Sequence, residues 1–180
     1  MRLIFQKKIL FVILFWFLIF DLKAESFFVK SDSLPTYSVY VFLSETCPMS
    51  QSYVSVLNKI QETYKNKSVE VIGIFPNFFT TDSSVAVFRK EFGTEFKLRR
   101  DIGFVFTNLL NAHITPEVFL MDKNKKVLYS GSIDNAYFRA GKRRGKTSAN
   151  YLIDATENML TDKKIEVQRV EPFGCLIVKD

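Results

Sequence analysis

The segment Val39-Tyr-Val-Phe-Leu-Ser-Glu-Thr-Cys-Pro-Met-Ser50 decides the fold. It opens with an apolar run rich in β-branched and aromatic residues, which predicts a buried strand. Pro48 suits the first turn of a helix, where its missing N–H costs nothing. Cys47 therefore lies where a strand passes into a helix. The free amides and dipole of a helix N-terminus favour a thiolate, the reactive form of cysteine, so the segment predicts a redox-active sulfur.

Residues 1–24 have the pattern of a secretory signal peptide. Basic residues precede an unbroken apolar run over residues 9–20, and Ala24 offers a small residue for cleavage. The alternative is an uncleaved membrane anchor, but spanning a bilayer takes about 20 residues. We therefore expect an exported protein of the periplasm, cell envelope or extracellular space. It would meet a membrane only through this segment, before cleavage.

The charge of the chain gives no reason to expect a nucleic-acid partner. The formal net charge is +6, and it falls to +3 once residues 1–24 are removed. Residues 139–146 concentrate five basic side chains, which we interpret as a solvated loop. A site for an anionic partner, or cover for a thiolate, is the alternative. With one histidine and no Cys/His cluster at ligand spacing, we expect no metal and no cofactor.

Hydrophobic periodicity predicts one α/β domain over residues 25–160, followed by a tail over residues 161–180. The first half reads as a parallel βαβ unit, with strands at 39–43 and 69–75 around a helix. A second helix has Thr80, Asp82 and Ser83 as capping candidates and Gly93 as its stop. A short extended segment at 96–100 and a short helix at 103–111 follow, and the inward residues of that helix are predicted to be Val105, Phe106, Leu109 and Leu110.

The second half predicts a hairpin and a closing helix. Pro116 opens a strand, where proline is tolerated. The turn covers residues 122–126 and the returning strand covers 127–132. A basic, glycine-containing loop at 134–147 leads to a helix at 148–160. A parallel pair followed by a hairpin predicts a central mixed sheet flanked by helices.

Three stretches in this order resemble a known family. Thr46-Cys-Pro at a helix start, with Thr115-Pro-Glu-Val-Phe-Leu-Met-Asp122 and Val127-Leu-Tyr-Ser-Gly-Ser-Ile-Asp134, resembles the thioredoxin superfamily. Within it, the chain looks most like the peroxiredoxin-like redoxins of the alkyl hydroperoxide reductase and thiol-specific antioxidant group. Gly141-Lys-Arg-Arg144 and Gly174-Cys-Leu-Ile177 resemble one exported branch of that group. The resemblance covers about residues 35–177 and implies a thioredoxin-like fold.

The resemblance also implies a set of site residues. Cys47 would be the nucleophile, faced by a cis-proline at Pro116. The backbone of Thr115 would lie beside the sulfur and could pair with an extended, thiol-bearing partner. Thr46, Pro48 and Ser50 complete the expected substrate-binding set.

Several other residues are candidates for activating the thiol. Ser44 matches the hydroxyl position of peroxiredoxins, although Tyr40 stands where their proline belongs. Those proteins hold the thiolate with an arginine, for which Arg100 and Arg139 are candidates. His113 could act as a base near neutral pH. Ser50 replaces the second cysteine of a Cys-x-x-Cys motif, and we leave open whether it donates to the sulfur or only lies on the helix surface.

Cys175, on a tail that we expect to be mobile, has three interpretations. It resolves an oxidised Cys47, forms a static disulfide with it, or is a free or intermolecular thiol. The first follows from sulfenic acid chemistry, which needs a second thiol to avoid further oxidation.

Two functional hypotheses follow. The first is an exported thiol-disulfide oxidoreductase in which Cys47 attacks a small peroxide or a protein disulfide. Cys175 or an external thiol reductant then restores the nucleophile. The second is a non-catalytic binding module that holds partner proteins by a mixed disulfide or by strand pairing along Thr115 and Pro116.

Overall fold

The computed structural model describes residues 37–139 and 141–179. The predicted signal peptide lies outside these residues. Within the described part of the chain, no helix has both the length and the apolar character needed to cross a membrane.

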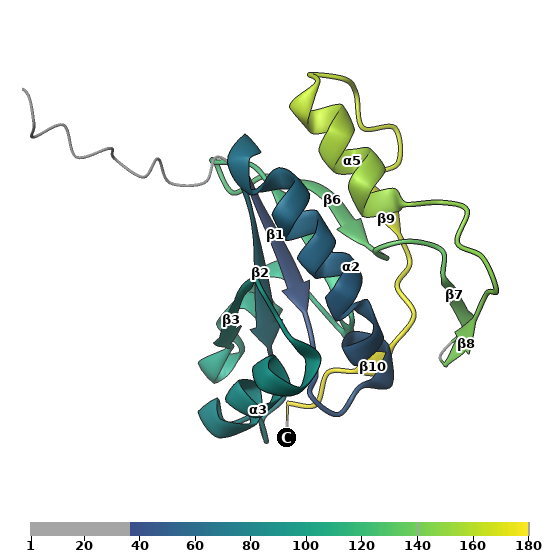
Figure 1. Cartoon of the computed structure of the whole chain (residues 1–180). Helices are drawn as coiled ribbons and strands as arrows, with labels where there is room; N and C mark the ends of the chain where they lie inside the picture. Colours follow the sequence, from purple (N-terminus) through teal and green to yellow (C-terminus); the bar gives the residue numbers. More distant parts are fainter. Residues whose placement is uncertain (1–36, 140, 180) are drawn as a thin grey trace, which may run out of the picture. The chain divides into compact units, whose positions relative to one another are not determined.

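A central mixed sheet of six strands organises the fold (Figure 1), in the order β3-β2-β1-β5-β6-β9. The strands β1, β2 and β3 are parallel, β5 runs antiparallel to both β1 and β6, and β9 is parallel to β6. The predicted βαβ unit and hairpin are therefore confirmed. The strands are β1 (Tyr37–Phe42), β2 (Val69–Phe75), β3 (Lys97–Arg100), β5 (Glu117–Met121), β6 (Val127–Gly131) and β9 (Arg169–Val170).

Apolar residues on β1 alternate between the two faces of the sheet, so both faces are covered. Val39 and Val41 belong to the larger core cluster, with residues of α2 (Pro48–Tyr64), α3 (Asp82–Phe92) and α5 (Tyr151–Leu160). Phe42 belongs to the smaller cluster on the opposite face, against which α4 (Val105–Leu110) packs. The 3₁₀ turns η1 (Lys65–Lys67) and η2 (Ile102–Phe104) follow α2 and precede α4.

The ends of α3 show how local sequence sets an element. Thr81 caps its start: its hydroxyl accepts a hydrogen bond from the Ser84 N–H, and the Ser84 hydroxyl accepts one from the Thr81 N–H. Gly93 ends the helix in a left-handed conformation with φ of 63°. The predicted stop is confirmed. The predicted cap is wrong: Thr81, which was not one of the three candidates, is the N-cap, and it lies between the candidates Thr80 and Asp82.

Two further predictions, on the short helix α4 and on the basic loop, are wrong. Val105 and Leu109 were expected to point inward but are 61 % and 70 % exposed, whereas Phe106 and Leu110 pack on the core. Both pairs have helical spacing, and only contact with the sheet selects between them. The expected basic loop contains a small hairpin of β7 (Tyr137–Arg139) and β8 (Lys142–Arg143).

The tail is paired rather than mobile. After β9, it continues to β10 (Cys175–Leu176), which pairs antiparallel with β4 (Ile114–Thr115). Figure 1 shows the tail in yellow, passing the N-terminal end of α2 before the chain ends near α3. Since β4 directly precedes β5, the tail reaches the start of a central strand.

Candidate redox site

Cys47 is the N-cap residue of α2, with extended backbone angles and Pro48 in the first helical turn, as the sequence predicts. Its residue exposure is 1 %. The sulfur of the neutral thiol donates a hydrogen bond to the backbone carbonyl of Thr115, with an Sγ–O distance of 3.2 Å. As a thiol, Cys47 makes no capping hydrogen bond to the helix.

Thr115 brings the second thiol to the same place. The Thr115–Pro116 peptide bond is cis, and the Thr115 residue is buried. Cys175 lies directly opposite Thr115 in the β10–β4 pair. Both cysteines are free thiols, Cys175 is half-buried, and the two side chains lie close enough for each to shift the pKa of the other. The end of the chain and the start of α2 therefore both lie against Thr115.

The surroundings of Cys47 favour its ionised form. Burial raises the pKa of the thiol, but hydrogen bonds outweigh burial and the net pKa lies below its ordinary value. The largest of them comes from the Cys175 thiol, followed by the amide and hydroxyl of Ser50 and the amide of Met49. These amides belong to the first turn of α2, where backbone donors have no helical partner.

The surroundings of Cys175 favour its neutral form. Burial, the hydrogen bond to Cys47 and the negative charge of Cys47 together raise its pKa to about 12. Cys175 is thus the proton donor and Cys47 the acceptor. Two of these three causes depend on Cys47, and only burial acts without it.

The other predicted residues lie in the loop before α2 and in its first turn. The Ser50 hydroxyl is fully buried and accepts a hydrogen bond from the Ser44 N–H at 3.1 Å, which leaves its own proton for the Cys47 sulfur. The Ser44 hydroxyl contacts that of Thr46 at 3.1 Å and accepts from the Asn77 amide at 2.8 Å. Thr46 and Pro48 are exposed.

Glu45 lies close to Cys47 in sequence, but its charge is held elsewhere. Its carboxylate accepts hydrogen bonds from the hydroxyls of Thr80 at 3.1 Å and Ser84 at 2.9 Å. The N-terminal end of α3 thus fixes the loop that leads to Cys47. Glu45 is not among the groups that shift the pKa of Cys47.

Three candidates for activation are not joined to the thiols. Arg100 is half-buried and pairs with Asp82 at 3.4 Å, while Arg139 and His113 are exposed. Among the described residues, none of the three side chains contributes a hydrogen bond to Cys47 or to the shift of its pKa. Backbone amides, Ser50 and Cys175 take the place of the expected arginine.

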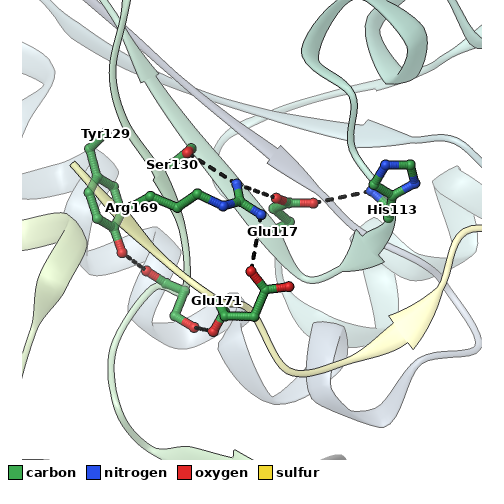
Figure 2. A network of polar contacts seen from close by, with 7 residues as sticks. His113, Glu117, Tyr129, Ser130, Arg169 and Glu171 are labelled. Atoms are coloured by element: carbon green, nitrogen blue, oxygen red, sulfur yellow. Dashed lines mark hydrogen bonds and ion pairs between the residues drawn. The ribbon is translucent and has the colours of Figure 1, made fainter. Parts of the chain in front are cut away.

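A polar network beside the cis-proline was not predicted. Glu117, which follows Pro116, is buried; its carboxylate pairs with Arg169 of β9 at 3.4 Å and accepts from the His113 N–H at 3.2 Å. Figure 2 shows the Arg169 guanidinium between Ser130, Glu117 and Glu171. A glutamate opening an otherwise apolar strand was the signal that could have revealed it. The network ties the start of β5 to the tail.

Within the described residues, no group of three or more His, Cys, Asp or Glu side chains is arranged to hold a metal ion.

Comparisons with known proteins support the fold alone. No protein-family profile and no curated protein matches the chain. A hypothetical protein from Sinorhizobium meliloti 1021 is similar in structure, with 24 % identity over 82 % of this chain and 81 % of that one and a TM-score of 0.72. An uncharacterized conserved protein from Geobacillus kaustophilus has 18 % identity over 81 % and 78 %, with a TM-score of 0.71.

A weaker similarity, on which we base no conclusion, is to a thioredoxin-like protein from Aeropyrum pernix. It has 19 % identity over 56 % of this chain and 71 % of that one, with a TM-score of 0.49. The mixed strand order, the helix that begins at Cys47 and the facing cis-proline are those of a thioredoxin-like fold. The fold predicted from the sequence is thus confirmed.

Proposed function

We propose that this chain is an exported, peroxiredoxin-like thiol oxidoreductase in which Cys47 is the nucleophile and Cys175 resolves it. One observation carries the proposal. Two free thiols from distant parts of the chain both lie against Thr115 at the start of a helix, and their pKa values are shifted in opposite directions. A buried structural cysteine needs neither the donors nor the partner that Cys47 has.

With a hydroperoxide as substrate, the Cys47 thiolate attacks the terminal peroxide oxygen. A sulfur–oxygen bond forms, the oxygen–oxygen bond breaks, and the leaving oxygen takes a proton to become water or an alcohol. Cys47 is then a sulfenic acid. Cys175 loses its proton and attacks the Cys47 sulfur, so that a disulfide forms and water leaves. The two thiols have supplied the two electrons that reduce the peroxide.

With a disulfide as substrate, the first bond formed is a mixed disulfide between Cys47 and one sulfur of the substrate, and the other sulfur leaves as a thiol. Cys175 then attacks Cys47 and releases the second substrate thiol. Both routes end in the same Cys47–Cys175 disulfide. An external dithiol reductant returns the pair to its starting state and is itself oxidised to a disulfide.

The alternative of a non-catalytic binding module fits the arrangement less well. Strand pairing along Thr115 needs a free edge, but Cys175 and Leu176 already pair there. A mixed disulfide held without turnover needs a site with no resolving thiol, whereas Cys175 touches Cys47. The alternative stays an outcome of the test below.

Turnover by the purified mature chain tests the proposal. With hydrogen peroxide or a disulfide substrate and an excess of a dithiol, we expect repeated substrate consumption. Cys47→Ser should abolish it, and Cys175→Ser should slow turnover while leaving the first oxidation of Cys47 intact. Wild-type protein that reacts once and accumulates mixed disulfides under the same conditions would instead support the binding module.

A further inference from the structure

The edge of β4 beside Cys47 is occupied by the chain's own tail. Cys175 faces Thr115 in the pair, the Thr115 hydroxyl donates to the Cys175 carbonyl at 3.4 Å, and the Ile177 N–H donates to the His113 carbonyl at 2.9 Å. The pairing places the Cys175 sulfur against Cys47. It thus shows where the sulfur of any extended polypeptide must lie to react with Cys47.

Gly174 permits this close approach. An added Cβ at this position would lie 2.2 Å from the Thr115 carbonyl oxygen, which is closer than any real contact. The obstacle is backbone rather than the end of a flexible side chain. Any larger residue at position 174 must therefore push the tail away from Thr115.

Contacts on both sides of Cys175 hold the tail in place. After it, the Val178 N–H donates to the Asn77 side chain at 2.9 Å and the Val178 carbonyl accepts from the Phe78 N–H at 3.0 Å. Before it, the Glu171 carbonyl accepts from the Ser132 hydroxyl at 2.8 Å. Figure 2 shows the Glu171 and Arg169 end of this attachment.

We infer that the tail determines the substrate class of the proposed reaction: it admits hydroperoxides to Cys47 and excludes extended polypeptide disulfides. A strand edge offers one row of backbone donors and acceptors, so a polypeptide can pair with Thr115 only after the tail leaves. A hydroperoxide needs no such edge. The inference rests on the proposed function, and Gly174 is its specificity-determining residue.

The test compares two oxidants in a Cys175→Ser background, where each Cys47 product is stable and can be counted by mass spectrometry. One oxidant is hydrogen peroxide, with the sulfenic acid trapped by dimedone. The other is a ten-residue peptide whose single cysteine carries an activated aromatic disulfide. The variants are Gly174→Val and a matched control, Gly145→Val, because a Cβ at Gly145 meets nothing within 4 Å.

We expect Gly174→Val to raise the rate of the peptide reaction about tenfold or more, in proportion to the fraction of molecules with the tail released. The rate with peroxide should change far less, and Gly145→Val should change neither. Hydrogen exchange at Ile177 should become faster in Gly174→Val, while β1 stays protected. These amides report release of the tail and an intact sheet separately.

A second variant keeps the inference testable if Gly174→Val does not fold. Ile177→Pro removes the N–H that donates to His113 and keeps an apolar side chain, so it should raise the peptide rate in the same direction. If both folded variants leave the ratio of the two rates unchanged, the tail inference is overturned while the proposed function stands. If Cys47 of the background protein reacts with neither peroxide nor iodoacetamide, the proposed function itself fails.

Discussion

The opposite pKa shifts of Cys47 and Cys175 set which of the two sulfurs is ionised first as the pH rises. Cys47 accepts donors from the helix start and from Cys175, so its pKa lies below the ordinary value. Cys175, with its pKa raised to about 12, keeps its proton at neutral pH. In the proposed reaction this asymmetry sets the order of the steps, since the thiolate attacks first and the neutral thiol reacts after that charge is gone.

Replacing Cys175 by alanine should raise the pKa of Cys47. The hydrogen bond from Cys175 is the largest of those that lower it, and alanine has no donor. The midpoint of the rise in alkylation rate with pH should therefore move to higher pH. The measurement is the iodoacetamide reaction rate of Cys47 across neutral and alkaline pH.

Cys175→Ser is the matched control for this prediction, because the serine hydroxyl keeps a donor at the same place. Its pH midpoint should lie closer to that of the wild type than the midpoint of Cys175→Ala. An unchanged midpoint in the alanine variant would show that Cys175 does not influence the ionisation of Cys47.

The position of Cys47 was predictable from residues close in sequence, but its surroundings were not. An apolar strand followed by Thr46-Cys-Pro48 is a local signal, and it placed Cys47 correctly at the start of α2. Arginines were expected to activate it because the family resemblance implies one. The actual partner, Cys175, comes from the end of the chain, and no local pattern specifies that pairing.

The strand β9 joins the tail to the central sheet, and a glycine in β6 makes this pairing possible. Gly131 of β6 faces Val170 of β9 with φ of 115°, and an added Cβ would lie 1.7 Å from the Val170 carbonyl oxygen. Only glycine accepts both this backbone conformation and this approach. The strand pair, and the Arg169 contacts that accompany it, depend on this position.

Gly131→Ala should lower the free energy of unfolding by about 3 kcal/mol, because the methyl group must displace the backbone of β9. Gly93→Ala is the control: it also has positive φ, at 63°, but a Cβ there meets nothing within 4 Å. It should cost about 1 kcal/mol. Urea denaturation measures both, and equal losses would contradict the close approach of β9 to β6.

Elements with strong periodicity were predicted well and short ones poorly. The strand at residues 69–75 matches β2, and Gly93 ends α3 as expected. The strands β4, β9 and β10 have two residues each, which is too short for an alternating pattern to appear. Their existence depends on pairing with distant strands, so they are visible only in the folded chain.

For the whole molecule, buried groups with raised pKa values predict loss of stability at alkaline pH. Burial is the largest cause for Cys175 and for three tyrosines, Tyr53, Tyr64 and Tyr129, whose pKa values are raised well above the ordinary value. The folded state keeps these protons after the unfolded state has released them. Their contribution to stability is therefore complete below the unfolded pKa values, about 8.5 for Cys and 10 for Tyr, and is lost as pH rises above them.

The midpoint of urea unfolding should consequently fall from about pH 9 to pH 11. Cys47 acts in the opposite sense: its pKa is lowered on folding, so its contribution is lost as pH falls. Because Cys47 is ionised in both the folded and the unfolded state above about pH 9, it does not change how the unfolding midpoint varies with pH in this range. Tyr53→Phe should make the decline shallower, and a midpoint independent of pH over this range would contradict the burial of these groups.

The measurement that most directly tests the pairing of the two thiols is a peptide map of the full, folded chain after one equivalent of hydrogen peroxide. Remaining thiols are alkylated before digestion, and disulfide-linked peptides are identified by mass spectrometry. We predict an intramolecular Cys47–Cys175 disulfide that a dithiol removes and that is absent from Cys47→Ser. Recovery of Cys47 as an unmodified thiol, or of Cys175 only in disulfides between two chains, would contradict the pairing.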